Sequence, residues 1–244
     1  MEVMTLEDAS ARRQVLGATF RSDCLDEFSI FETEFSDCSF LDCVFDGGKI
    51  GMSTFHNCRF TDCSFRDSKL LSCLFNNSDV DQRCVWSRCD LSDATFVDCD
   101  LSRNQLAACK GFMLRLEGCT LTEAKIDIDV HRHVNSKLNL GGMSCHKSNF
   151  YEASMVNQNL HSSTFEICDL RGADLSGSNL TSVNFLGSNL NATLLKNALL
   201  TGVNLAHADI DELDFSLTLA LEDITISNDQ RDTLLEYFRV KVVS

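Results

Sequence analysis

A large apolar residue recurs at every fifth position over most of this chain, and this period constrains the fold more than any other feature. Three blocks carry it: residues 20–80, 86–126 and 140–215. They contain 38 such positions, and 36 of these hold a large apolar residue, the exceptions being Gly111 and Cys145. Helices repeat their apolar face about every 3.6 residues and flat strands every two, so neither element alone explains the spacing.

A second pattern runs beside the first, because the residue two places before each apolar position is usually small. Of the 13 cysteines, 11 occupy this place. They are Cys38, Cys43, Cys58, Cys63, Cys73, Cys84, Cys89, Cys99, Cys109, Cys119 and Cys168. Two inward positions in every five, one bulky and one small, indicate a chain that bends after each short strand and closes into a solenoid with a filled axis.

Two stretches, DCSFLDCVFD at 37–46 and ADLSGSNLTSVNFLGSNLNA at 173–192, resemble pentapeptide repeats of the A-(D/N)-L-x-x type, and the match covers about four fifths of the chain. In that family four repeats form one square coil. The resemblance therefore implies an all-β fold: a right-handed quadrilateral parallel β-helix, here with a short C-terminal helix. At about 4.8 Å per coil, the repeats predict roughly nine or ten coils and a rod about 45 Å long.

The period divides the chain into an N-terminal cap at 1–19, a β-helix at 20–215 and a C-terminal cap at 216–244. Ser227 and Gln230 have the spacing of a capping box before a short helix. Leu234, Leu235 and Phe238 would form its apolar face, and Val240, Val242 and Val243 a closing strand. The end is interpreted either as a simple cap or as the contact of a two-fold homodimer.

Two interruptions break the period. Residues 127–139 lack it and are predicted to leave the coil as a loop, and a slip between Asp81 and Trp86 is interpreted as a bulge or short turn. Loops on rigid scaffolds often carry function, although an insertion without a role is the alternative. Asp127, Asp129, His131 and His133 could be imagined as metal ligands, but a polar loop is the favoured interpretation.

Enzyme and metal chemistry find little support in the sequence. The cysteine spacing follows the core repeat rather than the spacing of zinc sites, so no metal or other cofactor is expected. Cys145 and His146 are strand neighbours that point to opposite faces, which excludes a nucleophile–base dyad. No secretory signal or membrane-length apolar run is visible, which indicates a cytoplasmic protein with reduced thiols and no membrane contact.

The net charge of −15 excludes direct nucleic-acid binding as an expected role. Residues 20–80 carry −6 and residues 140–215 carry −5, whereas residues 81–139 are nearly neutral. A stiff acidic rod can compete for a basic groove that normally holds DNA, because charge steers the encounter. Solubility alone is an equally good explanation of the charge.

An interrupted pentapeptide rod with an acidic surface, a loop and a C-terminal helix resembles the Qnr-type and MfpA-type proteins. That resemblance implies a non-enzymatic DNA mimic that binds DNA gyrase and topoisomerase IV and protects them from quinolones or peptide toxins, giving antibiotic resistance or toxin immunity. The resemblance also implies which residues make contacts. Partner binding would involve the loop residues Asp127, Asp129, His131, Arg132 and His133. Dimerisation would involve the C-terminal residues Leu234, Leu235, Phe238, Val240 and Val242. The sequence shows no clear counterpart of the smaller, earlier Qnr-type loop, and an adaptor solenoid without a link to topoisomerases is the alternative.

Overall fold

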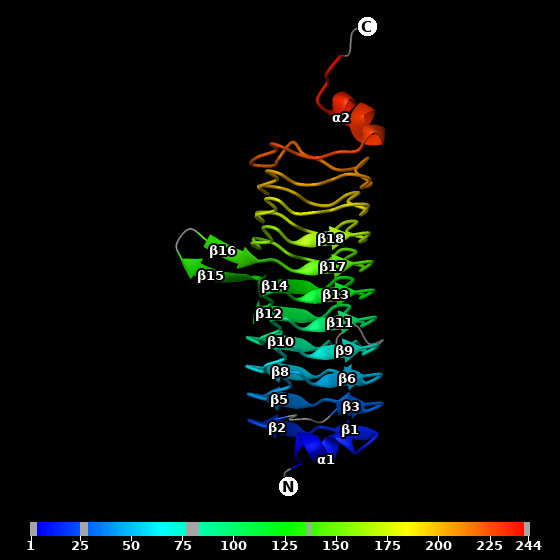
Figure 1. The fold of residues 1–244 in the computed structure, drawn as a ribbon. Coiled ribbons are helices and arrows are strands. Elements are labelled where there is room, and N and C mark those ends of the chain that lie inside the picture. The colour runs from blue at the N-terminus through cyan, green and yellow to red at the C-terminus, as the bar shows by residue number, and fades with distance from the viewer. Residues whose placement is uncertain (1–3, 25–28, 77–82, 136–137, 242–244) are drawn as a thin grey trace.

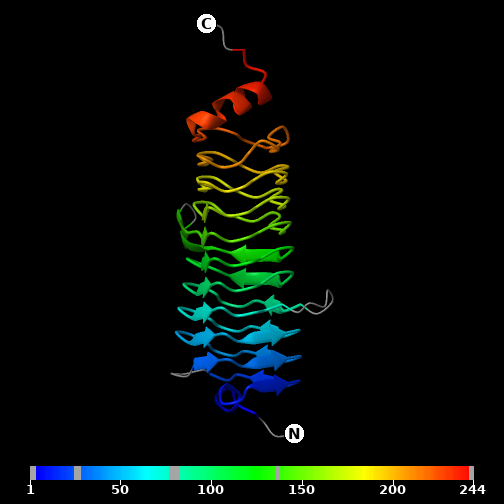
Figure 2. The same cartoon turned by 90° about the vertical axis from the view of Figure 1, so that its right-hand side faces the viewer.

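The computed structural model describes residues 4–24, 29–76, 83–135 and 138–241, without the side chains of residues 133–139. In this part of the chain, coils of nearly constant size stack into a tall column, with one short helix at each end (Figures 1 and 2). Coil-to-coil pairing is parallel throughout. The predicted quadrilateral parallel β-helix is therefore confirmed.

Each coil has four sides, which we number in chain order. Face 1 carries β1 (Gln14–Leu16), β4 (Glu34–Ser36) and β7 (Thr54–His56), and continues upward as isolated bridges. Face 2 carries β2 (Thr19–Arg21), β5 (Ser39–Leu41), β8 (Arg59–Thr61), β10 (Val85–Ser87), β12 (Gln105–Lys110) and β14 (Lys125–Asp129). Face 3 holds only isolated bridges, such as Val44 to Ser64 and Asn159 to Asn179.

Face 4 carries the largest sheet. Its strands are β3 (Ser29–Phe31), β6 (Lys49–Gly51), β9 (Lys69–Leu71), β11 (Thr95–Val97), β13 (Arg115–Glu117), β17 (Ser144–His146) and β18 (Thr164–Glu166). Each has three residues, of which the central one points inward. Because side chains alternate along a strand, the residues before and after it point outward.

The interior consists of stacked side chains of equivalent repeats. In the lower coils the rings of Phe20, Phe40, Phe60 and Trp86 stack in a continuous column, with centroids 5.0, 4.8 and 4.2 Å apart. Trp86 Nε1 donates to Asn104 Oδ1 at 2.9 Å, so the buried indole keeps a hydrogen bond. Leucines take over in the upper coils. Twelve of the 13 cysteines are buried, and all 12 are free thiols, as the repeat predicts.

Strand register shows where residues have been inserted. Phe20, Phe40 and Phe60 lie in register, so a regular coil has 20 residues. Phe60 pairs with Trp86, which makes that coil six residues longer, and an antiparallel bridge joins Asn76 to Arg83. The slip interpreted as a bulge or short turn is therefore a six-residue insertion at the corner between faces 1 and 2. Residues 77–82 themselves lie outside the described part.

A second insertion leaves the column as a hairpin between faces 3 and 4 (Figure 1). Leu116 pairs with Cys145, so this coil is nine residues longer than a regular one. The hairpin consists of β15 (His131–Asn135) and the antiparallel β16 (Leu138–Gly141). The predicted loop boundaries of 127–139 are wrong, because β14 keeps Asp127 and Asp129 on the coil.

The core position predicted for Leu140 is also wrong. Leu140 lies on the hairpin and is 49% exposed, whereas Val130 is fully buried and fills the inward place. The register between β12 and β14 shifts after Leu106, and Ile128 turns inward beside Gly111. A Cβ on residue 111 would overlap the Ile128 side chain, which explains this exception to the period.

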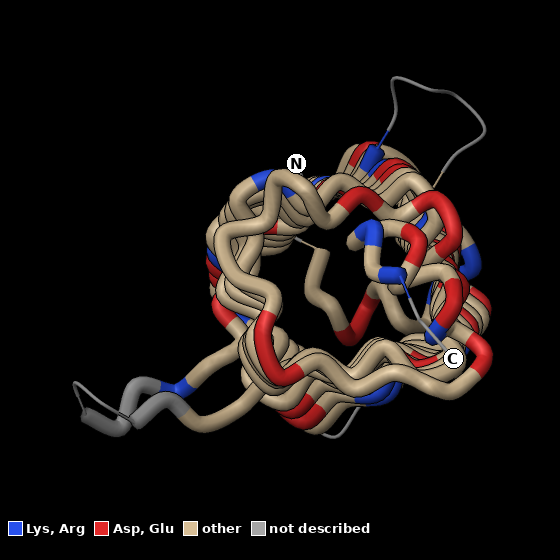
Figure 3. Tube along the Cα trace, turned by 90° about the horizontal axis from the view of Figure 1, so that it is seen from above, with Lys and Arg blue, Asp and Glu red and all other residues tan. Residues whose placement is uncertain are grey.

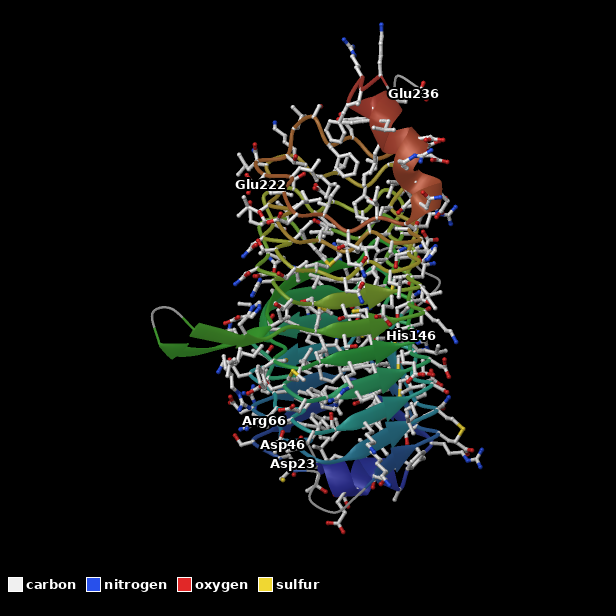
Figure 4. All side chains as sticks on the ribbon, turned by 45° about the horizontal axis from the view of Figure 1, so that its top comes forward. Asp23, Asp46, Arg66, His146, Glu222 and Glu236 are labelled. Carbon is white, nitrogen blue, oxygen red and sulfur yellow. The ribbon has the colours of Figure 1, made fainter. Side chains whose placement is uncertain are left out.

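The lower end is closed by α1 (Leu6–Ser10), which begins with a capping box between Thr5 and Asp8. Leu6 is fully buried, and its backbone N–H donates to Asp23 Oδ2 at 2.6 Å (Asp23 is labelled in Figure 4). Val15 in β1 already points into the core, so the solenoid begins near residue 14 rather than at residue 20.

The upper end is closed by η1 (Asn228–Gln230) and α2 (Arg231–Tyr237), and the predicted capping box of Ser227 and Gln230 is confirmed. Gln230 Nε2 also donates to Leu205 O and Ala208 O, both at 2.7 Å, and so satisfies carbonyls of the open coil. No strand follows α2 within the described residues; Val242 and Val243 lie outside them.

Candidate partner-binding surfaces

The two carboxylates predicted for the loop support the local backbone. Asp127 Oδ2 accepts a hydrogen bond from Ala108 N at 2.9 Å, and Asp129 Oδ1 accepts one from His131 N at 3.1 Å. Asp127 lies on face 2 and Asp129 on face 3. The two side chains therefore point from different sides of the column.

His131 anchors the hairpin instead of being displayed by it. Its side chain is only 5% exposed, and Nε2 lies 2.9 Å from His161 O, which is a hydrogen bond when this nitrogen carries the proton. The two imidazole rings stack with centroids 6.1 Å apart. The side chain of His133 lies outside the described residues. Among the described residues, no group of three or more His, Cys, Asp or Glu is placed to hold a metal ion.

Arg132 is exposed at the base of the hairpin. Its guanidinium lies 4.2 Å from the centroid of the Phe112 ring, a cation–π distance, and 3.8 Å from Asp93 Oδ2. The returning strand ends at Gly141 and is followed by Gly142; their φ angles are 130° and 123°. Residues with a side chain rarely adopt these φ angles, so the two glycines set the direction in which the hairpin leaves the column.

Charge is sorted by face, which the count along the chain did not reveal. On face 1, nine carboxylates point outward from the strands or the corner that follows: Glu34, Asp37, Asp100, Glu123, Glu152, Asp169, Asp209, Asp211 and Glu212. Among the described residues at these outward positions, two are basic, Arg103 and Arg171. In the view along the axis, acidic residues lie on several sides of the column (Figure 3), so the assignment to face 1 comes from the strand register.

Both arginines of face 1 are already paired with carboxylates of that face. Arg103 Nε lies 3.4 Å from Glu123 Oε2, and Arg171 binds Asp169 through two hydrogen bonds of 2.8 and 2.6 Å. These bonds from Arg171 hold the pKa of Asp169 below its ordinary value. The remaining seven carboxylates have no ion pair with Lys or Arg in the described structure.

The other faces carry less net charge. Face 3 has seven acidic residues (Asp46, Asp67, Asp90, Asp93, Asp129, Glu222 and Asp223) and three basic ones (Arg66, Lys110 and Arg132) among its described residues. Face 2 has five of each sign: Asp42, Asp62, Asp127, Asp174 and Asp214 against Arg21, Arg59, Arg88, Lys125 and Lys196. Face 4 has four of each: Glu32, Asp98, Glu117 and Glu166 against Lys49, Lys69, Arg115 and Lys147. Summing the charges over every fourth repeat, rather than over segments of the chain, would have shown that the acidic residues gather on face 1.

Cys145 and Cys168 have the properties of core thiols. Cys145 is fully buried, and burial raises the pKa of its thiol well above the ordinary value. Burial likewise raises the pKa of Cys168 to about 12. His146, half-buried on the outer side of β17 and labelled in Figure 4, is the strand neighbour of Cys145 and points away from it.

The residues predicted for dimerisation divide into two groups. Leu234 is 7% exposed and packs into the core of its own chain, so its assignment to a dimer contact is wrong, and Leu235 is half-buried. Phe238 and Val240 are 49% and 52% exposed. Two further apolar residues near this end are exposed, Leu217 at 57% and Leu219 at 66%. Val242 lies outside the described residues.

None of the described helices has both the length and the apolar character that crossing a bilayer requires.

Comparison with known proteins supports the fold. Residues 159–197 match the family model of pentapeptide repeats, in eight copies. Full-length QnrB1, a plasmid-mediated fluoroquinolone resistance protein, has a TM-score of 0.68 at 18% identity, over 94% of this chain and 100% of QnrB1. A second similar structure is HetL, a pentapeptide repeat protein involved in heterocyst differentiation regulation in the cyanobacterium Nostoc sp. strain PCC 7120. Its TM-score is 0.58 at 14% identity, over 91% of this chain and 94% of HetL. No curated protein sequence matches the chain.

Proposed function

We propose that this pentapeptide-repeat protein is a non-enzymatic cytoplasmic binding protein that occupies the DNA-binding groove of a type II topoisomerase. DNA gyrase or topoisomerase IV is the partner, and binding protects the enzyme from quinolones or peptide toxins. The observation that carries the proposal is face 1, where nine carboxylates point outward on one side of the column. QnrB1, a fluoroquinolone resistance protein, shares the fold.

Stacked coils give face 1 the properties of a duplex mimic. Coils repeat at about 4.8 Å, so carboxylates at equivalent places of neighbouring coils, such as Glu123 and Glu152, lie above one another on this side of the column. A groove lined by Lys and Arg attracts such a line as it attracts phosphates, because both partners are steered by the same field. The core of stacked aromatic and aliphatic side chains keeps the array straight.

The hairpin is proposed as a second contact beside the column. Arg132 and Leu140 are its described exposed side chains, and the base formed by His131, Phe112, Gly141 and Gly142 holds the hairpin in one direction. A partner that bound along the column would thus meet a projecting arm of fixed orientation.

The upper end is proposed to join two copies. Phe238, Val240, Leu217 and Leu219 present exposed apolar surface that no described residue covers, and a second copy related by a two-fold axis would bury it. Sedimentation of wild type and of the double variant F238E/L219E tests this contact. Dimeric wild type and a monomeric, folded variant are expected, whereas a monomeric wild type contradicts the dimer.

The function is tested with purified gyrase in a supercoiling assay containing ciprofloxacin. Added protein is expected to restore supercoiling at intermediate concentrations and to inhibit the enzyme at high ones, because a mimic competes with DNA. An equal concentration of a folded variant with reversed charges on face 1 serves as the control. Absence of both protection and inhibition over a wide concentration range contradicts the proposal.

An adaptor solenoid with a different protein partner is the second candidate. The observation in its favour is the structural similarity to HetL, which is involved in heterocyst differentiation regulation. Binding to a partner other than a topoisomerase, with no effect in the supercoiling assay, would favour the adaptor.

A further inference from the structure

The lower part of face 4 has two adjoining columns of outward residues that the topoisomerase proposal does not use. The residues before the inward positions are Lys49, Lys69, Thr95 and Arg115 in successive coils. The residues after them are Phe31, Gly51, Leu71 and Val97. One column is thus basic and the other apolar. At two residues apart along each strand, the columns lie about 6.6 Å from one another.

The apolar column is open to solvent. Phe31 is 42% exposed and Leu71 36%, and Met52 at the adjoining corner is 58% exposed. Gly51 is buried because the Phe31 ring lies over it; a Cβ on residue 51 would overlap that ring. Contiguous exposed apolar side chains on a monomer commonly mark a contact surface.

The basic column has an electrostatic cost that the fold does not relieve. Lys49 and Lys69 are paired in register on neighbouring strands, whose backbones are about 4.8 Å apart, and like charges in such a pair destabilise the sheet. Both are exposed, and neither they nor Arg115 forms an ion pair with any described residue. An acidic partner would relieve this repulsion.

The upper part of the same face has no basic column, and polar residues interrupt its apolar one. There the residues before the inward positions are the neutral Ser144, Thr164, Asn184 and Asn204, and those after them are His146, Glu166, Leu186 and Ala206. The pattern is therefore a local property of four or five coils and not a consequence of the repeat itself.

We propose that this surface binds an amphipathic helix of a partner protein, apolar on one side and acidic on the adjacent flank. A helix lying along the column advances about 5.4 Å per turn, close to the coil spacing of about 4.8 Å, so successive turns meet successive coils. A strand in the same orientation repeats the side chains of one face about every 6.6 Å, which does not match the coil spacing. From the Phe31 coil to the Arg115 coil is about 19 Å, or about 13 helical residues.

A protein helix fits better than nucleic acid. The columns lie on a chain of net charge −15, with the acidic face 1 around the adjoining corner, and exposed Phe, Met and Leu side chains offer nothing to phosphates. Helix recognition by an apolar surface with a charged border needs only the groups found here. The proposed helix-binding surface lies on a different face from the proposed topoisomerase contact, and the two are tested independently.

A display library of 14-residue helical peptides, selected on the full-length protein, tests the surface. Enriched peptides are expected to carry apolar residues at helical spacing with Asp or Glu on one flank. Binding of the consensus peptide, measured by fluorescence anisotropy, should weaken at least tenfold in K49E/K69E and in M52S/L71S. It should change less than twofold in K125E/K196E, which alters charge equally on face 2.

Three outcomes would overturn the inference: enrichment of basic or non-helical peptides, equal affinity of K49E/K69E and K125E/K196E, or binding of duplex DNA with the same dependence on Lys49 and Lys69. Circular dichroism of each variant checks its fold. Because the readout contains no topoisomerase, failure here leaves the gyrase assay unaffected, and failure of that assay leaves this one unaffected.

Discussion

Face 1 and face 4 are built from the same repeat on the same coils, yet they present opposite chemistry. Face 1 carries nine carboxylates and two arginines that are already paired, whereas face 4 carries four charges of each sign and an exposed apolar column. The inward residues that determine the fold are alike on both. The difference shows that in a solenoid the outward positions are free to specify several surfaces without altering the core.

The largest expected effect comes from reversing charge on face 1. Gyrase affinity should fall about 100-fold, or roughly 2.7 kcal/mol, in E152K/D211K/E212K, because three attractive contacts become repulsive. The matched control E32K/D42K/E117K shifts the net charge equally on faces 4 and 2 and should cost less than fivefold. Surface plasmon resonance with immobilised gyrase measures both, and equal losses would mean that net charge rather than face 1 governs binding.

A smaller effect separates face 1 from the hairpin, which leaves the column between faces 3 and 4. In G142A the added methyl meets Ser162 O at 2.8 Å at a φ of 123°, so the free energy of unfolding should fall by about 2 kcal/mol. Gly187 also has a positive φ, but its nearest neighbour would be 3.7 Å away, and G187A should cost about 1 kcal/mol. Urea denaturation gives both values.

The same pair of variants shows which surface dominates gyrase binding. Neither alters charge on face 1, so affinity within threefold of wild type in G142A would assign the main contact to that face. A loss comparable to that of the triple reversal would transfer it to the hairpin.

Salt should distinguish the two faces further. Screening reduces attraction between exposed charges, so gyrase affinity is expected to fall about tenfold between 50 and 200 mM salt. Binding of the helical peptide to face 4, with its apolar column, should fall only about threefold under the same conditions. Titrations at four salt concentrations provide the slopes, and parallel slopes would contradict the division of roles.

The smallest effect concerns Arg171, which neutralises part of face 1. R171Q should strengthen gyrase binding about twofold by exposing one more carboxylate. Because Arg171 lowers the pKa of Asp169 in the folded state, the pair stabilises the fold above the ordinary pKa of Asp, and this contribution disappears as pH falls through the lowered folded pKa. R171Q should therefore unfold at a lower temperature than wild type at pH 7, with the gap closing toward pH 2.

Sequence periodicity predicted the coils well because the inward positions have one dominant requirement, burial. It failed where a different residue could meet that requirement equally well. Leu140 matches the period, but Val130 reaches the inward place first because Gly111 leaves room for Ile128. Leu234 looks like the other apolar residues of its helix, and only the docking of α2 on the last coil shows that it faces inward.

The candidate surfaces were less predictable than the core. Outward residues obey no period, so the acidic face appears only after the coil length assigns each repeat to a side. His131 and Asp129 were predicted as partner contacts because the resemblance to Qnr-type proteins placed them in a projecting loop. The structure gives both a role in the base of the hairpin, through His161 O and the backbone of His131.

Both insertions enter at corners and leave the next coil in register: Trp86 pairs with Leu106, and Cys145 with Phe165. Extra residues are thus absorbed locally, and neither end of the column is shifted along the repeat. The scaffold can therefore acquire, lose or exchange projecting segments one corner at a time, without compensating changes elsewhere. A family built this way can diversify its recognition by grafting, and an engineer could place a foreign epitope at either corner with the same tolerance.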